Sequence, residues 1–446
     1  MAPVGVSRRS VLRGLLAVSA GGAAASALSG CGALTGFATT GGSGMTFFST
    51  QFTPVEEGER FRAILRDAVE SEVSYVTSEP GPFITQTRTQ VDAGSVRSSL
   101  LGGLHGDLAP LADGYLTDLT DLLEGLGDLG WPAEFLDLAR VGTDRTWYVP
   151  WAQASYVVAA RKEMLEHLPS GADVRDLTYD QFLDWAAAAR EANGGKPVLA
   201  LPAGPKGLLH RFTQGFLLPS FTGGQITTFR SGDAADAWEY FRELWQVCVP
   251  ASTTYDFMQE PLASGEAMIG WDHVARLIDA PRRDPDNWIM VPSPRGPKGL
   301  GYMVVLAGLA IPRDAPDSDT AHEVISALSR PETQLDLLRA NAFFPTVRAE
   351  LTGDLPPAIT LEADAVNRQR TAPDALLALP PVGLGEREGE VTKVFKDCFQ
   401  SIVLDEADVR STLDAQAQIL NELLADIKAP CWAPDPPSDG KTCEVA

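Results

Sequence analysis

Short apolar runs alternate along the chain with longer segments in which an apolar residue returns every three or four positions. The runs at 45–49, 73–76 and 197–201 are typical of strands, and the segments that start at Thr53 and Thr178 open with capping boxes and continue with helical spacing. The same pattern predicts helices at 83–101, 118–126, 133–140, 207–218 and 331–341 and strands at 108–111, 267–271, 288–292 and 302–311. Alternating strands and helices predict an α/β fold.

The stretch 146–161 divides this pattern into two parts. Its segment from Ser155 to Ala160 is apolar on both faces, which suits a strand buried inside an α/β sheet. Strands and helices alternate both before and after it, so we expect a strand that crosses between two lobes. Because ligand sites favour domain interfaces, Trp151 and Gln153 are candidate ligand contacts at this crossing.

Further candidate contacts follow from the positions of polar and aromatic residues near predicted strand ends. Gln51 and Phe52 follow the first strand and precede a helix, where open α/β sheets bind ligands. Phe52 has an alternative role as a hydrophobic staple, and Gln51 as a solvated side chain. Asp107 flanks the predicted strand 108–111 and is either a ligand contact or part of a solvated loop. His210 and Gln214 belong to the predicted helix 207–218 and are expected to point at a cleft.

Composition and charge limit the class of protein. The 446 residues suffice for two or three domains, and a hydrophobic content of 44% fits a globular protein. The formal net charge of -23 argues against nucleic acid as a partner, because phosphate binding needs clustered Lys and Arg.

The first thirty residues have the pattern of an export signal. Arg8 and Arg9 resemble a twin-arginine signal, and the apolar run 14–28 is shorter than the roughly 20 residues of a membrane span. Leu28-Ser29-Gly30-Cys31 matches the lipoprotein signal-peptidase motif. We therefore expect a signal peptide at 1–30, a lipid on Cys31, a flexible tether at 31–44 and a location on the extracytoplasmic face of the membrane. The alternative is a free structural cysteine after an ordinary signal peptide, and the export route is left open.

The chain contains five cysteines, of which four follow the signal segment: Cys248, Cys398, Cys431 and Cys443. An even number in an exported protein suggests two disulfides, for which three pairings are possible. Closing the proline-rich loop between Cys431 and Cys443 would contribute about 3 kcal/mol by restricting the unfolded chain. We expect that pair first, which leaves Cys248 to pair with Cys398.

Motifs for catalysis and metal binding are missing from the sequence. The five histidines are scattered, and there is no H-E-x-x-H, paired C-x-x-C or G-x-S-x-G motif. Residues 125–130 satisfy G-x-G-x-x-G, but without a preceding strand they lack phosphate-binding geometry. Carboxylates are too numerous to single out a glycosidase pair. We expect no metal, no cofactor and no enzymatic activity.

A series of loose motifs, taken in order, resembles the extracellular solute-binding protein family that serves carbohydrate import by ATP-driven transporters. The motifs are Tyr148-Val149-Pro150 with Arg161-Lys162, residues 177–182, Gly265 with Ala267, Met268, Gly270 and Trp271, Pro292 with Pro294 and Gly296, residues 309–312, Pro331 with Glu332 and Gln334, and residues 344–346. The similarity runs over nearly all of the chain after the signal segment.

The resemblance implies a periplasmic-binding-protein-like fold, in which two α/β lobes are joined by crossing hinge strands. We place the crossings near 150–155, 302–306 and 343–346. The first lobe would comprise 45–152 with 305–343, and the second 153–304 with 344–446.

The resemblance also implies sugar-binding residues, because pyranose faces stack on aromatic rings and hydroxyls need fixed donors and acceptors. Trp271 corresponds in position to a stacking tryptophan of the family, and Asp272 beside it is an expected acceptor of hydroxyl hydrogen bonds. Trp151 and Phe344 are further stacking candidates, and Tyr302 at the second crossing is a further contact. The chain departs from the family where a Pro-Asp pair is replaced by His105-Gly106-Asp107.

The expected function is that of a monomeric, lipid-anchored binding protein that delivers a mono- or oligosaccharide to the permease of an ABC importer. One alternative keeps the fold but binds a glycerophosphodiester or another polar metabolite, for which Arg211 and Lys206 are available. A second alternative is a secreted carbohydrate-active enzyme.

Overall fold

The computed structural model describes residues 45–53, 55–350, 355–381, 384, 387–438 and 440–445, all within the compact unit formed by residues 44–446. The expected signal peptide, the tether and the lipidated Cys31 lie outside the described residues. No helix in the described ranges combines the length and the hydropathy that a membrane span requires.

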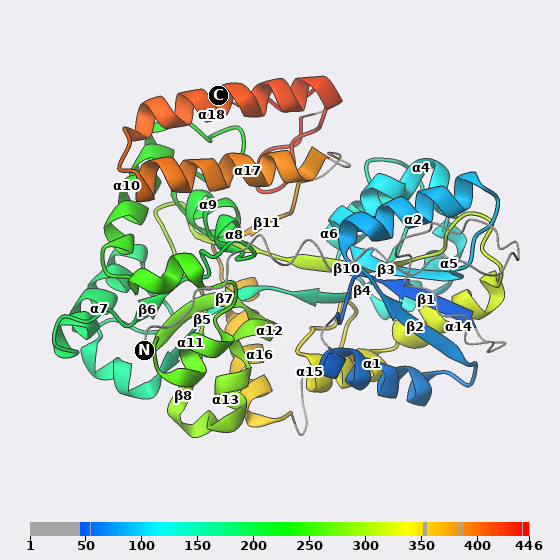
Figure 1. Ribbon diagram of the computed structural model, residues 1–446, viewed down its shortest axis with the longest axis horizontal. Helices are drawn as coiled ribbons and strands as arrows, with labels where there is room; N and C mark the ends of the chain where they lie inside the picture. Colours follow the sequence, from blue (N-terminus) through cyan, green and yellow to red (C-terminus); the bar gives the residue numbers. More distant parts are fainter. Residues whose placement is uncertain are drawn as a thin grey trace, which may run out of the picture. The chain divides into compact units, whose positions relative to one another are not determined.

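The first sheet has five strands in the order β2-β1-β3-β10-β4 (Figure 1). Its strands are β1 (Met45–Ser49), β2 (Val73–Thr77), β3 (Leu100–Leu104), β4 (Val149–Ala154) and β10 (Val305–Ala310). β1 runs parallel to β2 and β3, whereas β10 runs antiparallel to both β3 and β4. The carboxyl ends of β1 and β3 therefore meet at the same edge of this sheet.

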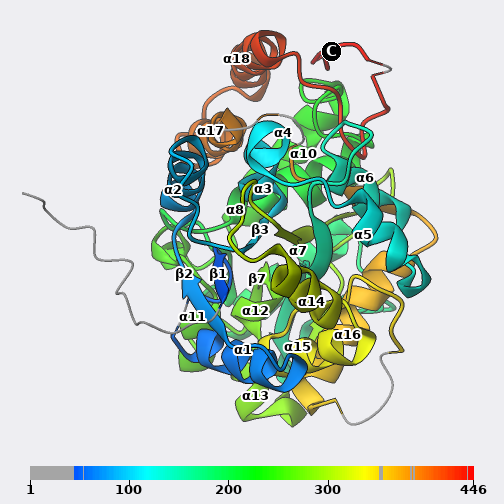
Figure 2. The same cartoon turned by 90° about the vertical axis from the view of Figure 1, so that its right-hand side faces the viewer.

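Helices cover both faces of the first sheet. Successive side chains of β1 point to opposite faces, and both Phe47 and Phe48 are apolar and buried. Phe47 packs against Phe61 of α1 (Val55–Ala68), with 6.0 Å between ring centroids. Phe48 packs at 5.0 Å against Phe83 of α2 (Pro80–Asp92) on the other face. The helices α14 (Ser318–Leu328) and α15 (Pro331–Asn341) lie beside α1 (Figure 2).

The second sheet has four strands in the order β6-β7-β5-β8, namely β5 (Tyr156–Arg161), β6 (Leu199–Ala200), β7 (Ile269–His273) and β8 (Trp288–Val291). β5 pairs antiparallel with β7 and β8. The predicted capping box of α7 (Tyr179–Ala192) is confirmed, because Thr178 Oγ1 accepts from the backbone N–H of Gln181. Other helices near this sheet are α11 (Gln259–Ser264), α12 (Val274–Leu277), α13 (Asp279–Arg283) and α16 (Pro357–Thr371).

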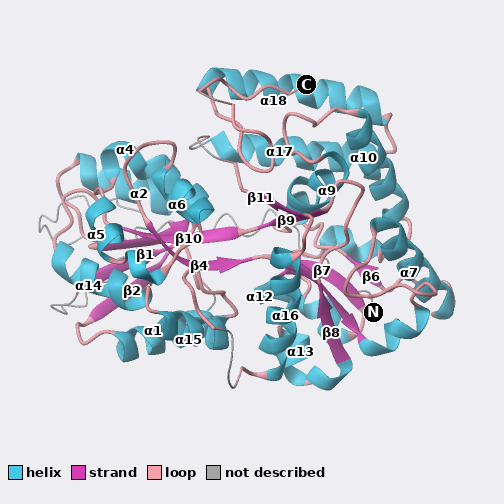
Figure 3. Cartoon of the chain, turned by 180° about the vertical axis from the view of Figure 1, so that it is seen from behind, coloured by secondary structure: helices cyan, strands magenta, loops and turns pink. Residues whose placement is uncertain are grey.

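A two-stranded sheet of β9 (Leu300–Met303) and β11 (Ala375–Ala378) packs against α9 (Leu218–Thr222), as Figure 3 shows. Further long helices here are α10 (Gly232–Trp245), α17 (Glu388–Cys398) and α18 (Val409–Ile427). The short helices are α3 (His105–Leu108), α4 (Ala112–Tyr115), α5 (Thr120–Gly125), α6 (Ala133–Arg140) and α8 (Leu209–Phe212). Single turns of 3-10 or π-helix occupy Ala109–Leu111, Gly127–Leu129, Lys162–His167, Thr213–Leu217, Pro250–Thr254, Pro285–Asn287 and Phe399–Leu404.

Connections between the sheets lie where the sequence predicts them. The chain passes from β4 in the first sheet to β5 in the second at Ser155, and from β9 to β10 at Val304. In the third connection, Phe344 forms two backbone hydrogen bonds with Gln153, of 3.0 and 2.7 Å. The two-lobed arrangement is confirmed, whereas the proposed residue limits of each lobe stay a prediction.

The hydroxyl of Ser155 ties two of these connections together. It donates a hydrogen bond of 2.8 Å to the carbonyl of Met303 and accepts one of 3.0 Å from Nε2 of Gln369 in α16. Ser155 is buried, so this small network is shielded from water.

Three sequence predictions about elements were wrong. The predicted helix 83–101 ends at Asp92, and its last residues begin β3. Gly102 and Gly103 make the sequence of β3 untypical of a strand. Glycine is required at position 102, because a Cβ there would lie 2.7 Å from the ring of Phe47. The predicted strand 108–111 is instead the helical segment after β3, and the apolar run 302–311 is divided between two sheets.

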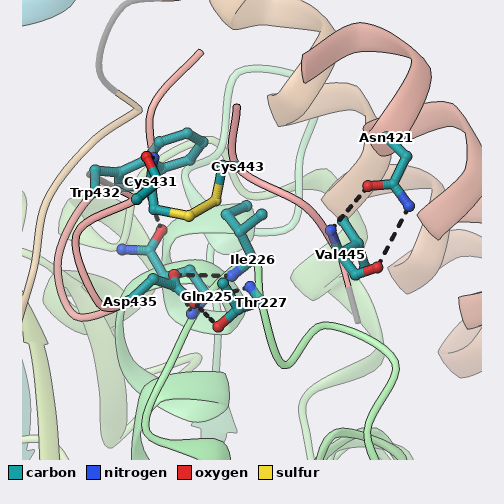
Figure 4. Close-up of a disulfide and its surroundings, with 10 residues drawn as sticks. Gln225, Ile226, Thr227, Asn421, Cys431, Trp432, Asp435, Cys443 and Val445 are labelled. Carbon is teal, nitrogen blue, oxygen red and sulfur yellow. Dashed lines mark hydrogen bonds between the residues drawn. A yellow bond between two sulfur atoms is a disulfide. The ribbon is translucent and has the colours of Figure 1, made fainter. Parts of the chain in front are cut away.

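The expected disulfide between Cys431 and Cys443 is confirmed, with 4.7 Å between the Cα atoms (Figure 4). The loop that it closes is held by Asp435, whose carboxylate accepts from the backbone N–H groups of residues 225–227. The expected second disulfide was wrong, because Cys248 and Cys398 are free, buried thiols. Cys248 instead directs Sγ to the carbonyl of Leu244.

Candidate functional site

A cavity of about 440 Å³, here called the cleft, lies between the first sheet and elements of the second. It is lined by Thr50, Gln51, Phe52, Thr53, Glu57, Leu104, His105, Gly106, Asp107, Tyr156, Leu208, Arg211, Phe257, Gln259, His273, Ala275, Arg276, Val305, Leu306, Phe343 and Pro380. Its size is within the roughly 300–1,000 Å³ that small-molecule sites occupy.

The first wall of the cleft is built at the carboxyl ends of β1 and β3. Thr50 follows β1 and donates a hydrogen bond of 2.6 Å from Oγ1 to Asp107 Oδ2, beyond β3. Asp107 Oδ2 also accepts from the backbone N–H of Leu104 at 3.0 Å, and Gln51 Nε2 donates to Thr50 Oγ1 at 3.0 Å. Parallel strands thus bring together two of the predicted contacts, Gln51 and Asp107.

Phe52, the third predicted contact in the cleft, has a backbone φ of 52° in the left-handed region. Its ring meets Phe343 edge-on at 5.2 Å and Trp151 edge-on at 6.0 Å. Trp151 does not line the cleft and is only 1% exposed, since it packs behind Phe52 against Phe61. Trp151 therefore lies behind the part of the wall that Phe52 forms.

Tyr156 and His273 line the cleft where the second sheet begins. Trp271, the expected stacking tryptophan, is fully buried and lies behind them, with its indole stacked on Tyr156 at 4.9 Å. The carboxylate of Asp272 is also buried, and it accepts from the backbone N–H groups of Met258 at 3.0 Å and His273 at 2.7 Å. The structure therefore gives Trp271 and Asp272 positions in the core and not on the cleft surface.

The second wall carries an aromatic ring and two cations that the sequence reading did not group together. Phe257 is 40% exposed, and the guanidinium of Arg276 lies over its ring at 4.2 Å. Arg211 also lines the cleft and donates from Nη1 to Gln214 Oε1 at 3.2 Å. Arg276 could have been predicted as a cleft residue from its position, because it follows the end of β7 by three residues.

The other predicted contacts lie away from the cleft. His210 lines a separate cavity of about 260 Å³, and Gln153 and Phe344 line a small one of about 60 Å³ at the third connection. Gln214 is fully buried, and Tyr302 is buried on β9. The structure thus places Gln51, Phe52 and Asp107 on the surface of the cleft, whereas the remaining candidates do not line it.

Burial sets the charge of the ionisable groups around the cleft. Burial lowers the pKa of His105 to about 4 and that of His273 to about 3, so both rings are neutral near pH 7. Burial raises the pKa of Glu57, although Arg60 opposes the shift. The cleft at neutral pH therefore presents guanidinium groups on the second wall and carboxyl groups on the first.

Within the described part of the chain, no group of three or more His, Cys, Asp or Glu side chains is placed to hold a metal ion. The polar and aromatic side chains of the cleft can bind a small solute through hydrogen bonds and ring contacts.

Comparison with known families agrees with this geometry. The family described as bacterial extracellular solute-binding protein matches residues 54–335, which is more than half of the chain. The chain belongs to this family. No curated protein sequence matches it.

Solved structures of similar fold include several solute-binding proteins. Maltose-bound MalE3 from T. maritima has a TM-score of 0.69 and 19% identity, over 85% of this chain and 99% of that chain. UgpB from Mycobacterium tuberculosis, in complex with glycerophosphocholine, has a TM-score of 0.68 and 17% identity, over 86% and 100%. The GacH receptor of Streptomyces glaucescens, studied with acarbose, has a TM-score of 0.68 and 16% identity, over 86% and 99%. At these identities the likeness shows a shared periplasmic-binding-protein-like fold.

Proposed function

We propose that this protein is the extracytoplasmic substrate-binding component of an ABC importer, and that its cleft binds a mono- or oligosaccharide for delivery to the permease. The observation that carries the proposal is the cleft itself, because the hydrogen-bonded Thr50, Gln51 and Asp107 line the same cavity as the aromatic residue Phe257. Hydroxyl groups require such fixed donors and acceptors, and ring C–H groups pack on aromatic faces.

Family membership supports a binding role, and MalE3 was solved with maltose. A glycosidase needs two carboxyl groups that flank the scissile bond. Glu57 and Asp107 both belong to the first wall, and Asp107 is engaged by Thr50 and Leu104. We therefore propose that the solute leaves the cleft unchanged.

The proposal includes a lipid anchor on Cys31 and a monomeric protein. The motif at 28–31 supports the anchor, and the tether at 31–44 would keep the folded unit near the membrane surface. Metabolic labelling with a fatty acid should mark the wild type and leave Cys31→Ala unlabelled.

Calorimetric titration with a panel of neutral sugars tests the solute class. We expect one binding site per chain and weaker binding in Gln51→Ala. Ile419→Ala is the matched control, because this exposed residue lies on α18 and does not line the cleft. Incubation followed by recovery of the sugar should return it intact. If the protein binds no member of a broad panel that also includes charged polyols, this result would contradict a role as a solute-binding protein.

A further inference from the structure

The walls of the cleft differ in charge. Elements around the first sheet contribute the carboxyl side chains Glu57 and Asp107, and elements around the second contribute the guanidinium groups Arg211 and Arg276. A solute that spans the cleft therefore meets acceptors on one side and permanent positive charge on the other.

Of the two arginines in the cleft, Arg276 is the one with a buried N–H group that has no hydrogen-bond acceptor. Its guanidinium packs on the ring of Phe257, and Nη1 is buried without a hydrogen-bond partner. Among the described residues, no carboxylate forms an ion pair with Arg276 within 4.0 Å. An unsatisfied buried donor on a charged group is costly, and a bound acceptor would relieve that cost.

Asp272, on β7 of the second sheet, does not fill this role. Both oxygens of Asp272 accept from backbone N–H groups, at 3.0 Å from Met258 and 2.7 Å from His273. Asp272 is fully buried and does not line the cleft, so a solute in the cleft would not contact it. Burial raises the pKa of the Asp272 carboxyl, and the charge of Arg276 opposes that shift, so the two groups interact at longer range without a direct ion pair. The guanidinium itself packs on the ring of Phe257 at the edge of the cleft.

We propose that the solute is a hydroxylated anion, and that Arg276 binds its carboxylate or phosphate group while Phe257 fixes the guanidinium. This inference rests on the solute-binding role in the proposed function; it adds an anionic group to the solute and does not require the solute to be a saccharide. Arginine suits the task because its planar donors match the oxygens of carboxylates and phosphates. The hydroxyl end of the solute would face Asp107 and Gln51 on the first wall.

The overall charge of the protein makes a local cation necessary. A chain with a net charge of -23 repels an anion at long range, and this repulsion weakens as salt screens it. Short-range pairing inside a partly buried cleft is screened much less. Moderate salt should therefore not abolish anion binding, in contrast to binding by an exposed basic patch.

Matched probes test the proposal by titration calorimetry. The neutral probes are glucose and glycerol. The probes that carry an anionic group are glucuronate, glycerol 3-phosphate and glycerophosphocholine, of which the last is a zwitterion. Glucuronate tests for a carboxylate, and the two phosphate probes distinguish a monoester from a diester. We expect at least one anionic probe to bind about tenfold or more tightly than its neutral counterpart, as for a hydrogen bond to a charged group.

The variants are Arg276→Met, Arg276→Lys and Arg283→Met. Arg276→Met should lose this preference for the anion, Arg276→Lys should retain part of it through its charge, and Arg283→Met, an exposed change on α13, should retain all of it. Thermal unfolding of each variant confirms that the fold is intact.

Failure of every anionic probe to bind would overturn the inference, as would an unchanged preference in Arg276→Met. Binding of neutral sugars alone, with equal affinity in wild type and Arg276→Met, would overturn the inference and leave the proposed function in place. Failure of the neutral and the anionic probes together would count against both.

Discussion

The indole of Trp271 stacks on the phenol ring of Tyr156, with 4.9 Å between centroids and 10° between the ring planes. Tyr156 lines the cleft, whereas Trp271 is fully buried behind it. Phe212 and Phe216 meet the indole edge-on at 5.0 and 5.3 Å, and Nε1 donates to Ser293 Oγ at 3.0 Å. The tryptophan is therefore part of the core that supports the cleft.

Trp271→Ala should lower the free energy of unfolding by about 3–5 kcal/mol, because it leaves a cavity among packed aromatic rings and an unpaired Ser293 hydroxyl. Denaturant unfolding measures this loss. Trp271→Phe should recover much of it, since it refills most of the volume. A stability equal to that of the wild type, together with lost binding, would instead place the indole in contact with the solute.

Phe257→Ala should have the opposite profile. The ring is 40% exposed and lines the cleft, so its removal should cost less than about 1 kcal/mol of stability, mainly the contact with Arg276. Solute affinity should fall about tenfold, because the guanidinium loses its support. Calorimetric titration beside a thermal melt separates the two effects. A change in stability without a change in affinity would contradict this role.

Opening the loop at Cys431 and Cys443 should destabilise the protein by about 3 kcal/mol, as expected for a bond that spans 12 residues. The double variant Cys431→Ser/Cys443→Ser, or reduction of the wild type, should give the same loss in denaturant unfolding. Cys248→Ser and Cys398→Ser serve as comparisons. Because both thiols are free, each variant should lose the same stability on reduction as the wild type. A wild type that is indifferent to reduction would contradict the prediction.

The buried His105 should make the protein less stable in acid. Its pKa falls from the usual value near 6.5 to about 4 through burial, and Nδ1 lies 2.8 Å from the hydroxyl of Tyr148. A depressed pKa means that the unfolded chain takes up a proton first as the pH falls. The contribution of neutral His105 is therefore fully present above pH 6.5 and is lost between about pH 6.5 and pH 4.

His105→Gln tests this assignment. The stability difference between wild type and variant should shrink by about 3 kcal/mol from pH 7 to pH 4, since only the wild type has a proton to bind there. Denaturant unfolding at a series of pH values measures the difference. Parallel curves for the two proteins would show that another group is responsible for acid sensitivity.

Local patterns predicted most of the fold. The first strand, the capped helix after Thr178 and the helix that starts at Pro331 are confirmed, because each is specified by neighbouring residues. The crossing at Ser155 was also predictable, since a segment that is apolar on both faces must be buried. Periodicity alone predicted one strand over 302–311 and did not show that strand pairing changes at Val304, although the family resemblance placed a crossing near 302–306.

The candidate site was harder to predict for a physical reason. All five residues of β7 are buried, so alternation within the strand could not tell which side chains reach the cleft. The family resemblance led to Trp271, which corresponds in position to a stacking tryptophan, while the cleft residues His273 and Arg276 come after it. Gln51 and Phe52 line the cleft as expected, because they follow the end of the first strand, a rule that needs no knowledge of side-chain direction. Asp107 also lines the cleft, but the strand that it was expected to precede is helical, and it follows β3 instead.

The Ser155 hydroxyl links two of the connections between the sheets mechanically. It fastens the β4–β5 linkage to the backbone at Met303, next to the β9–β10 linkage, and to Gln369 of α16. We expect this shared fastening to make the two linkages bend together and not independently. Ser155→Ala should loosen that restraint without changing a residue that lines the cleft.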